Sequence, residues 1–112
     1  MRKEIKELKR LGQMPTVSIQ DDDTIMDKIK QYDELLSKIE LPIDYDEAIV
    51  LVKLFPEGFF YDLHWDLLKL IESILPNISE EKYLDLINEC PSPEWKELLT
   101  QRFQNWLESK KV

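Results

Sequence analysis

Apolar residues recur every three or four positions along most of this chain of 112 residues, a spacing typical of amphipathic α-helices. Proline and glycine interrupt the spacing and divide it into six stretches. The six expected helices cover residues 2–11, 23–40, 44–55, 59–75, 79–90 and 92–109. No segment of useful length other than residues 16–20 alternates with a period of two, so the pattern predicts an all-α protein with five to six helices.

Residues that suit helix caps stand at the start of four of these stretches, and Asp22 or Asp23 can cap the helix of residues 23–40. Asp44 can accept a backbone hydrogen bond while Glu47 reaches back to the chain before the helix, as in a capping box. Ser79 and Ser92 are expected to cap the last two helices, and Pro93 suits the first helical position. Other prolines mark helix ends, because the residue before a proline is pushed out of the helical region.

The apolar residues of each stretch predict which side is buried. In the second helix the buried stripe is expected to consist of Ile25, Ile29, Tyr32, Leu36 and Ile39. In the fifth helix the inward residues are expected to be Tyr83, Leu84, Leu86, Ile87 and Cys90. The third helix is apolar on nearly all sides, which indicates that neighbouring helices cover it.

The residues that mark the starts and the ends of the expected helices recur at a nearly constant interval. The expected caps Asp44 and Ser79 are 35 residues apart, and so are Pro56 and Pro91. A short helix followed by a longer one therefore repeats. This predicts stacked antiparallel helical hairpins, an α-solenoid-like arrangement with a period near 35 residues, within one domain over residues 1–112. A plain six-helix bundle is the alternative.

Charge is distributed unevenly along the chain, whose formal net charge is −8. Residues 1–10 hold five basic and two acidic side chains, whereas residues 21–66 hold 13 acidic and four basic ones. The domain thus divides into a basic N-terminal helix with a linker, residues 1–22, and an acidic helical-hairpin core, residues 23–109. Such a core repels nucleic acid and anionic membranes and attracts a protein with a basic surface. Solubility alone is the simpler interpretation.

Cysteine usage and hydropathy indicate the compartment. The single cysteine, Cys90, excludes an intramolecular disulfide, which fits a reducing environment. The first ten residues are charged throughout and do not resemble a signal peptide. The longest apolar run, residues 48–52, is far shorter than a membrane span. We therefore expect a cytoplasmic protein.

No pattern of reactive residues in the sequence points to catalysis. The one histidine, His64, is two residues from both Asp62 and Asp66, a separation that places side chains about 200° apart on a helix. An Asp–His hydrogen bond within the helix is therefore excluded, and we expect His64 at the edge of the core, bonded to a neighbouring helix. Zinc would need more histidine or cysteine ligands than the sequence offers. We assign no catalytic, cofactor-binding or metal-binding residue, and we do not expect an enzyme.

Aromatic residues within acidic segments are the candidates for partner binding. Tyrosine and tryptophan anchor protein interfaces, and the surrounding acids would select a basic partner. The candidates are Asp44, Tyr45, Asp46, Glu57, Tyr61, Asp62, Trp65 and Asp66. The simpler interpretation treats these residues as ordinary helix starts with solvated faces.

The segment FFYDLHWDLLKLIES, residues 59–73, resembles a motif of the small all-helical immunity proteins of bacterial polymorphic toxin systems. The family motif has the form aromatic-x-Leu-x-Trp-x-Leu-(Leu/Val)-His-Leu-Ile-Glu. The matching residues are Tyr61, Leu63, Trp65, Leu67, Leu68, Leu70, Ile71 and Glu72. The segment departs from the motif at Asp62, where glycine is expected, and at Lys69, where histidine is expected.

This resemblance implies a protein without enzymatic activity that binds and neutralises a cognate toxin domain, often a nuclease, inside the producing cell. Acidity fits this function, because a nuclease presents a basic substrate groove. The resemblance adds Glu72 to the candidate partner-binding residues, although Glu72 could equally tie one hairpin to the next. The alternative is a helical-repeat adaptor or regulatory protein that binds another protein or a peptide.

Overall fold

The computed structural model describes residues 2–14, 23–56 and 63–110, with only the backbone for residues 23–25. Within these ranges the chain is helical and contains no strand, which confirms the all-α prediction. The helices are α1 (Lys3–Leu11), α2 (Asp23–Ser37), α3 (Tyr45–Val52), α4 (Leu63–Glu72), the 3₁₀ turn η1 (Leu75–Asn77), α5 (Glu80–Asn88) and α6 (Pro93–Ser109). No helix in the described ranges has both the length and the apolar character needed to cross a bilayer.

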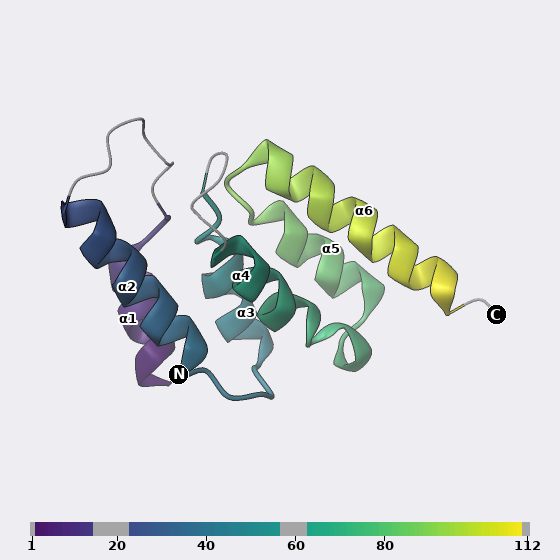
Figure 1. Ribbon diagram of the computed structural model, residues 1–112. Coiled ribbons are helices and arrows are strands. Elements are labelled where there is room, and N and C mark those ends of the chain that lie inside the picture. Colours follow the sequence, from purple (N-terminus) through teal and green to yellow (C-terminus); the bar gives the residue numbers. More distant parts are fainter. Residues whose placement is uncertain (1, 15–22, 57–62, 111–112) are drawn as a thin grey trace.

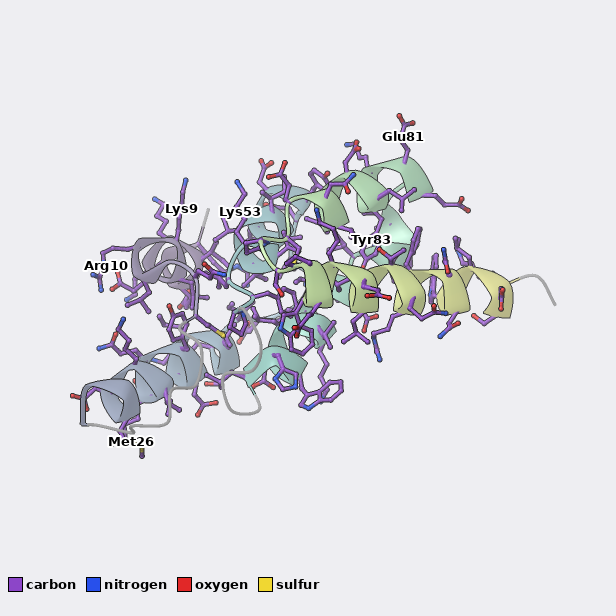
Figure 2. The ribbon with its side chains drawn as sticks, turned by 90° about the horizontal axis from the view of Figure 1, so that it is seen from above. Lys9, Arg10, Met26, Lys53, Glu81 and Tyr83 are labelled. Atoms are coloured by element: carbon purple, nitrogen blue, oxygen red, sulfur yellow. The ribbon has the colours of Figure 1, made fainter. Side chains whose placement is uncertain are left out.

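The six α-helices stack as three pairs, which follow one another along the long axis of the molecule (Figure 1). Each pair joins a shorter helix to a longer one: α1 to α2, α3 to α4, and α5 to α6. Figure 2 shows that α1, α3 and α5 form one layer, here called the short-helix layer, and that α2, α4 and α6 form the long-helix layer. The result is an elongated shape that measures 49 × 30 × 20 Å.

Two helices of the short-helix layer, α1 and α3, run parallel to each other. Arg2, beside the start of α1, donates two hydrogen bonds to Glu47 near the start of α3, the shorter at 2.6 Å. Beyond the ends of the same helices, the backbone N–H of Met14 donates to the carbonyl oxygen of Leu54 at 2.9 Å. The two helices are therefore joined start to start and end to end.

The helix α5 continues this layer in the same direction. The hydroxyl of Tyr45, the first residue of α3, donates to the carbonyl oxygen of Lys82 near the start of α5 at 3.0 Å. The ammonium of Lys53, at the end of α3, lies 3.6 Å from a carboxylate oxygen of Glu89, at the end of α5. The helix pairs are stacked in the manner that the sequence predicts, and the period near 35 residues stays a prediction.

Local sequence chemistry determines where several helices begin and end. Asp44 accepts a hydrogen bond from the backbone N–H of Glu47 at 2.8 Å, and Glu47 accepts one from the backbone N–H of Asp44 at 3.1 Å, which confirms the capping box. Ser79 and Ser92 cap α5 and α6 as predicted. Gly12 ends α1 with a φ of 77°, which residues with a β-carbon rarely adopt.

Four helices end earlier than the sequence pattern suggests, and one of them is α5, which ends at Asn88 rather than at residue 90. The helix α2 ends at Ser37 rather than at residue 40, α3 at Val52 rather than at 55, and α4 at Glu72 rather than at 75. In each case the chain continues with hydrogen bonds between residues three apart, because the last turn tightens before the proline that follows. Outside the described part lie the side chains expected to cap α2 (Asp22 or Asp23), residues 16–20 and residues 59–62.

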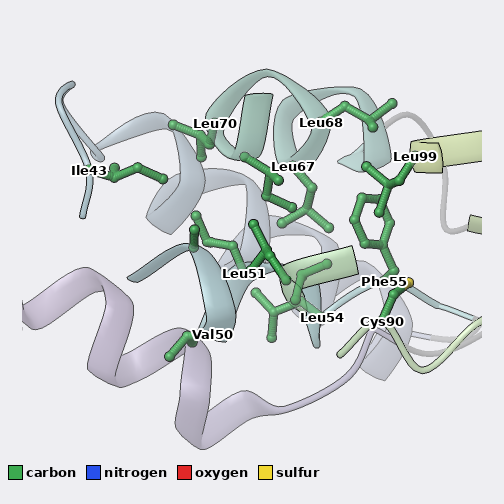
Figure 3. Packing of buried hydrophobic residues seen from close by; sticks show 14 of the residues in the cluster. Ile43, Val50, Leu51, Leu54, Phe55, Leu67, Leu68, Leu70, Cys90 and Leu99 are labelled. Carbon is green, nitrogen blue, oxygen red and sulfur yellow. The ribbon is translucent and has the colours of Figure 1, made fainter. Parts of the chain in front are cut away.

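The core lies between the two layers. The helix α3 is at its centre, where Ala48, Leu51 and Val52 are fully buried, as predicted for a helix that is apolar on nearly all sides. Figure 3 shows Leu51 facing Leu67 of α4 across the boundary between the layers. Burial of each large apolar side chain contributes about 1.5–3 kcal/mol, so this contact is a main source of stability.

The predicted faces of α2 and α5 agree with the structure at all described positions except one. The side chains that are buried or partly buried as predicted are Ile29, Tyr32, Leu36, Ile39, Tyr83, Leu86, Ile87 and Cys90. The prediction for Leu84 is wrong, because this side chain is 45% exposed. It lies about 100° around the helix from Tyr83, on a side that the packing of α5 against α3 and α6 leaves open. The side chain of Ile25 is outside the described part.

Candidate partner-binding surface

The structure separates the predicted partner-binding residues into groups. Asp44, Tyr45 and Asp46 lie at the start of α3 in the short-helix layer. Trp65 and Asp66 lie at the start of α4 in the long-helix layer. Because α3 and α4 run antiparallel, these two groups are at opposite ends of the pair (Figure 1). Outside the described residues lie Glu57, Tyr61 and Asp62.

Tyr45 is surrounded by charged residues from two helices. Its hydroxyl donates to the carbonyl oxygen of Lys82, whose ammonium lies 5.3 Å from the centre of the tyrosine ring. Partial burial raises the pKa of Tyr45 above its ordinary value, and the carboxylates of Asp85, Glu89 and Asp46 raise it further. The charges of three carboxylates from α3 and α5 therefore act on one tyrosine.

These residues form the most acidic part of the short-helix layer. Residues 44–53 and 80–89 together carry a formal net charge of −5, whereas residues 2–10 of the same layer carry +3. Figure 2 shows Lys9 near one end of this layer and Glu81 near the other. The layer thus changes from basic to acidic along the stack. We give the name acidic surface to the group Tyr45, Asp46, Asp85 and Glu89, whose three carboxylates are exposed.

Sequence reasoning does not select Asp85 and Glu89 as partner-binding residues. Their charges are evident in the sequence, but their position beside Tyr45 depends on the register between α3 and α5. The predicted repeat offers the one signal that could have found them, because residues about one repeat apart, such as Lys53 and Glu89, become neighbours.

A hydrogen-bond network holds the first turn of α3 and with it Tyr45. Glu47 is 4% exposed, and its carboxylate accepts from the guanidinium of Arg2 at 2.6 and 3.3 Å. Arg2 also donates to the carbonyl oxygens of Glu40 and Pro42, at 2.7 and 3.0 Å. A buried carboxylate needs partners of this kind, so the charge of Glu47 is used inside the protein rather than offered to a partner.

Four aromatic rings, those of Phe55, His64, Trp65 and Trp95, meet at the other end of the α3–α4 pair. The centroid of the His64 ring lies 4.7 Å from that of Trp95 on α6 and 4.8 Å from that of Trp65. Phe55 stacks on Trp95 with centroids 5.2 Å apart. His64 is 4% exposed, so it lies inside the core and not at its edge as expected. Of the four side chains, Trp65 is the one that a partner could reach, with 50% exposed.

Asp66 lies next to Trp65 and is exposed. It lines a cleft of about 280 Å³ between α2 and α4, together with Asp33 and Lys69. The ammonium of Lys69 offsets part of the negative charge of this cleft. This cleft therefore carries charges of both signs.

Glu72 is bonded within the chain. The guanidinium of Arg102 on α6 donates to its two carboxylate oxygens at 2.9 and 2.8 Å. The side chain of Glu72 is 23% exposed, and the pair lines a pocket of about 410 Å³ beside Trp106. This geometry supports the structural interpretation of Glu72, while its contact with a partner stays a prediction.

The reactive side chains of the described residues are placed for packing. Cys90 is 5% exposed, and its Sγ donates to the carbonyl oxygen of Ser92 at 3.6 Å. Burial raises the pKa of the Cys90 thiol, whereas reactive cysteines have a lowered pKa and access to solvent. Cys90 is thus a buried hydrophobic residue, as predicted. Across the described part of the chain, no three histidine, cysteine, aspartate or glutamate side chains gather as metal ligands would.

A comparison of the chain with protein-family models, with curated proteins and with solved structures gives no significant match. The expected family therefore depends on residues 59–73 alone. Most matching residues of this motif are buried as core, namely Leu63, Leu67, Leu68, Leu70 and Ile71. Two of the matches in the described part are accessible: Trp65 is half exposed, and Glu72 is partly exposed and paired with Arg102, while Tyr61 is outside that part.

Proposed function

We propose that this protein is an immunity protein that binds a cognate bacterial toxin domain, with a nuclease as the expected kind, in the cytoplasm of the producing cell. It neutralises the toxin by covering the basic surface that the toxin needs for its substrate. The observation that carries this proposal is the acidic surface. There the parallel helices α3 and α5, joined by the hydrogen bond from Tyr45 to Lys82, carry the exposed carboxylates of Asp46, Asp85 and Glu89.

The physical argument joins charge with rigidity. Complementary charge steers two proteins together and can raise their association rate by orders of magnitude over that of a neutral pair. The carboxylates of the acidic surface stand on α3 and α5, which Tyr45 and Lys82 fasten to each other. Little conformational freedom is then lost when a partner binds, and less of the interaction energy is spent on ordering.

Growth of a bacterial host tests the proposal. The product of the neighbouring upstream reading frame is expressed alone and then together with this protein. We expect that product to stop growth when expressed alone and growth to return when both proteins are present. The proposal fails if the neighbouring product is harmless, or if it remains toxic in the presence of this protein.

A second function, that of a helical-repeat adaptor or regulatory protein, is favoured by the stacking of the helix pairs. Stacked helical hairpins present extended surfaces on which peptides and other helices bind. An adaptor would have a partner that is not toxic, and its binding would depend less on salt concentration. The growth experiment therefore distinguishes the two functions.

A further inference from the structure

A groove of about 350 Å³ runs between α1 and α3. Figure 2 shows Lys9 and Lys53, one from each side of this groove, projecting on the same face of the short-helix layer. The floor is apolar and the rim is charged: the floor consists of Ile49, Val50 and Leu54, and the rim of Lys9, Asp46 and Lys53. We call this hollow the α1–α3 groove.

The walls of the α1–α3 groove are held in place at the end where α1 finishes. The backbone N–H of Met14 donates to the carbonyl oxygen of Leu54 at 2.9 Å. The side-chain amide of Gln13 donates to the carbonyl oxygen of Phe55 at 3.0 Å. A β-carbon added to Gly12, which also lines the groove, would meet no atom within 4 Å. The groove is therefore open beside Gly12, and hydrogen bonds join its two walls at that end.

The α1–α3 groove and the acidic surface adjoin each other along α3. Asp46 lines the groove and also belongs to the acidic surface. Lys53 lines the groove and pairs with Glu89 of the acidic surface at 3.6 Å. An apolar hollow and a set of carboxylates thus lie next to each other where Tyr45, Asp46 and Ile49 of α3 reach the surface, which is the arrangement of an apolar anchor site with a charged border.

We propose that the partner inserts an apolar side chain into the α1–α3 groove while its lysine or arginine side chains lie over the acidic surface. This inference depends on the proposed function and names the chemistry of the segment that binds. Charge complementarity gives the direction of that segment. Its basic residues extend toward α5, where Asp85 lies and where they would compete with Lys53 for Glu89, and away from α1, where Lys9 would repel them.

A synthetic peptide tests this site without the natural partner. The probe is a helical peptide of about 16 residues that consists of leucine and lysine. One control peptide has serine in place of each leucine, and another has glutamate in place of each lysine. The measurement is the shift of the methyl NMR signals of Ile49, Val50 and Leu54, together with the dissociation constant.

Two variants of the protein form a matched pair for the same experiment. Ile49→Ser removes the partly exposed apolar side chain of the groove, and Leu84→Ser removes an exposed apolar side chain of the same layer outside the groove. We expect the leucine–lysine peptide to shift the three methyl signals. Ile49→Ser should weaken its binding about fivefold or more, and Leu84→Ser less than about twofold.

The inference is overturned if the serine–lysine peptide binds as tightly as the leucine–lysine peptide, because charge alone would then explain the binding. It is also overturned if the methyl signals of the groove do not move in the wild-type protein. The proposed function is tested separately. If Ile49→Ser still neutralises the toxin and a variant without the three carboxylates does not, the inference about the groove is wrong and the immunity function stands.

Discussion

Glu72 at the end of α4 and Arg102 on α6 form an ion pair with two hydrogen bonds, at 2.9 and 2.8 Å. The pair joins the second and third helix pairs within the long-helix layer. An arginine bonded in this forked manner fixes geometry better than a single hydrogen bond, because both planar groups must align. A residue that the sequence marks for partner binding thus has a partner inside the protein.

Loss of this pair should lower stability by a small amount. We expect Arg102→Ala to lower the free energy of unfolding by about 0.5–1 kcal/mol, because both side chains are partly exposed. Thermal unfolding followed by circular dichroism would show a Tm lower by roughly 2–4 °C. The double variant with Glu72→Ala should lose little more than either single variant, and fully additive losses would contradict the coupling. Glu97→Ala, exposed on the same helix, is the control.

Arg2 should matter more than its position near the start of the chain suggests. Arg2→Ala leaves the carboxylate of Glu47 buried with fewer partners, and we expect a loss of about 2 kcal/mol. Amide hydrogen exchange should become faster throughout α1. Lys3→Ala changes an exposed neighbour and should alter stability by less than about 0.5 kcal/mol. Equal effects of the two substitutions would show that the network around Glu47 does not hold α1.

The two tryptophans that contact His64 should differ sharply in their contribution to stability. Trp95 is 5% exposed between Phe55 and His64, so Trp95→Ala should lower the free energy of unfolding by about 3–5 kcal/mol. Trp65 is 50% exposed, and Trp65→Ala should cost about 1 kcal/mol or less. Urea unfolding measures both values, with Trp95→Phe as a milder variant. Similar losses at both positions would contradict the placement of the rings.

Alkaline pH should destabilise the protein through its buried phenols. Burial raises the pKa of Tyr83 well above its ordinary value of 10.0, so the folded state keeps a proton that the unfolded chain releases. The stabilising contribution of Tyr83 is therefore complete below about pH 10 and is lost as the pH rises above that value. Chemical denaturation at several pH values from about 8 to 11 measures the slope. Tyr83→Phe should make the slope shallower, and an unchanged slope would contradict this account.

The parts of the fold that depend on residues close together in the sequence were predictable. Asp44, Ser79 and Ser92 cap their helices because a short side chain with an oxygen acceptor reaches the backbone a few residues ahead. Such a bond needs no other part of the protein. Helix existence and the buried faces follow in the same way from the spacing of apolar residues.

The parts that depend on helix packing were not predictable to the same degree. Leu84 has the spacing of a core residue, but the sequence does not show which sides of α5 other helices cover. Within the described part of the chain, no helix covers the side that carries Leu84. The effect of Asp85 and Glu89 on the pKa of Tyr45 likewise depends on the register between α3 and α5. The division of the predicted site residues between two layers has the same cause, because α3 and α4 belong to different layers.

The central claim is that the acidic surface binds a basic partner, and a pair of charge variants tests it most directly. One variant combines Asp46→Asn, Asp85→Asn and Glu89→Gln. The control variant combines Asp27→Asn, Glu34→Gln and Glu97→Gln, which removes three exposed negative charges on α2 and α6.

The measurement is the dissociation constant for the product of the neighbouring upstream reading frame, at low and at high salt. We predict that the first variant binds about tenfold more weakly than the wild type at low salt, with a smaller dependence on salt. The control variant should bind within about twofold of the wild type. Equal affinities of the two variants, or weaker binding by the control, would contradict the claim.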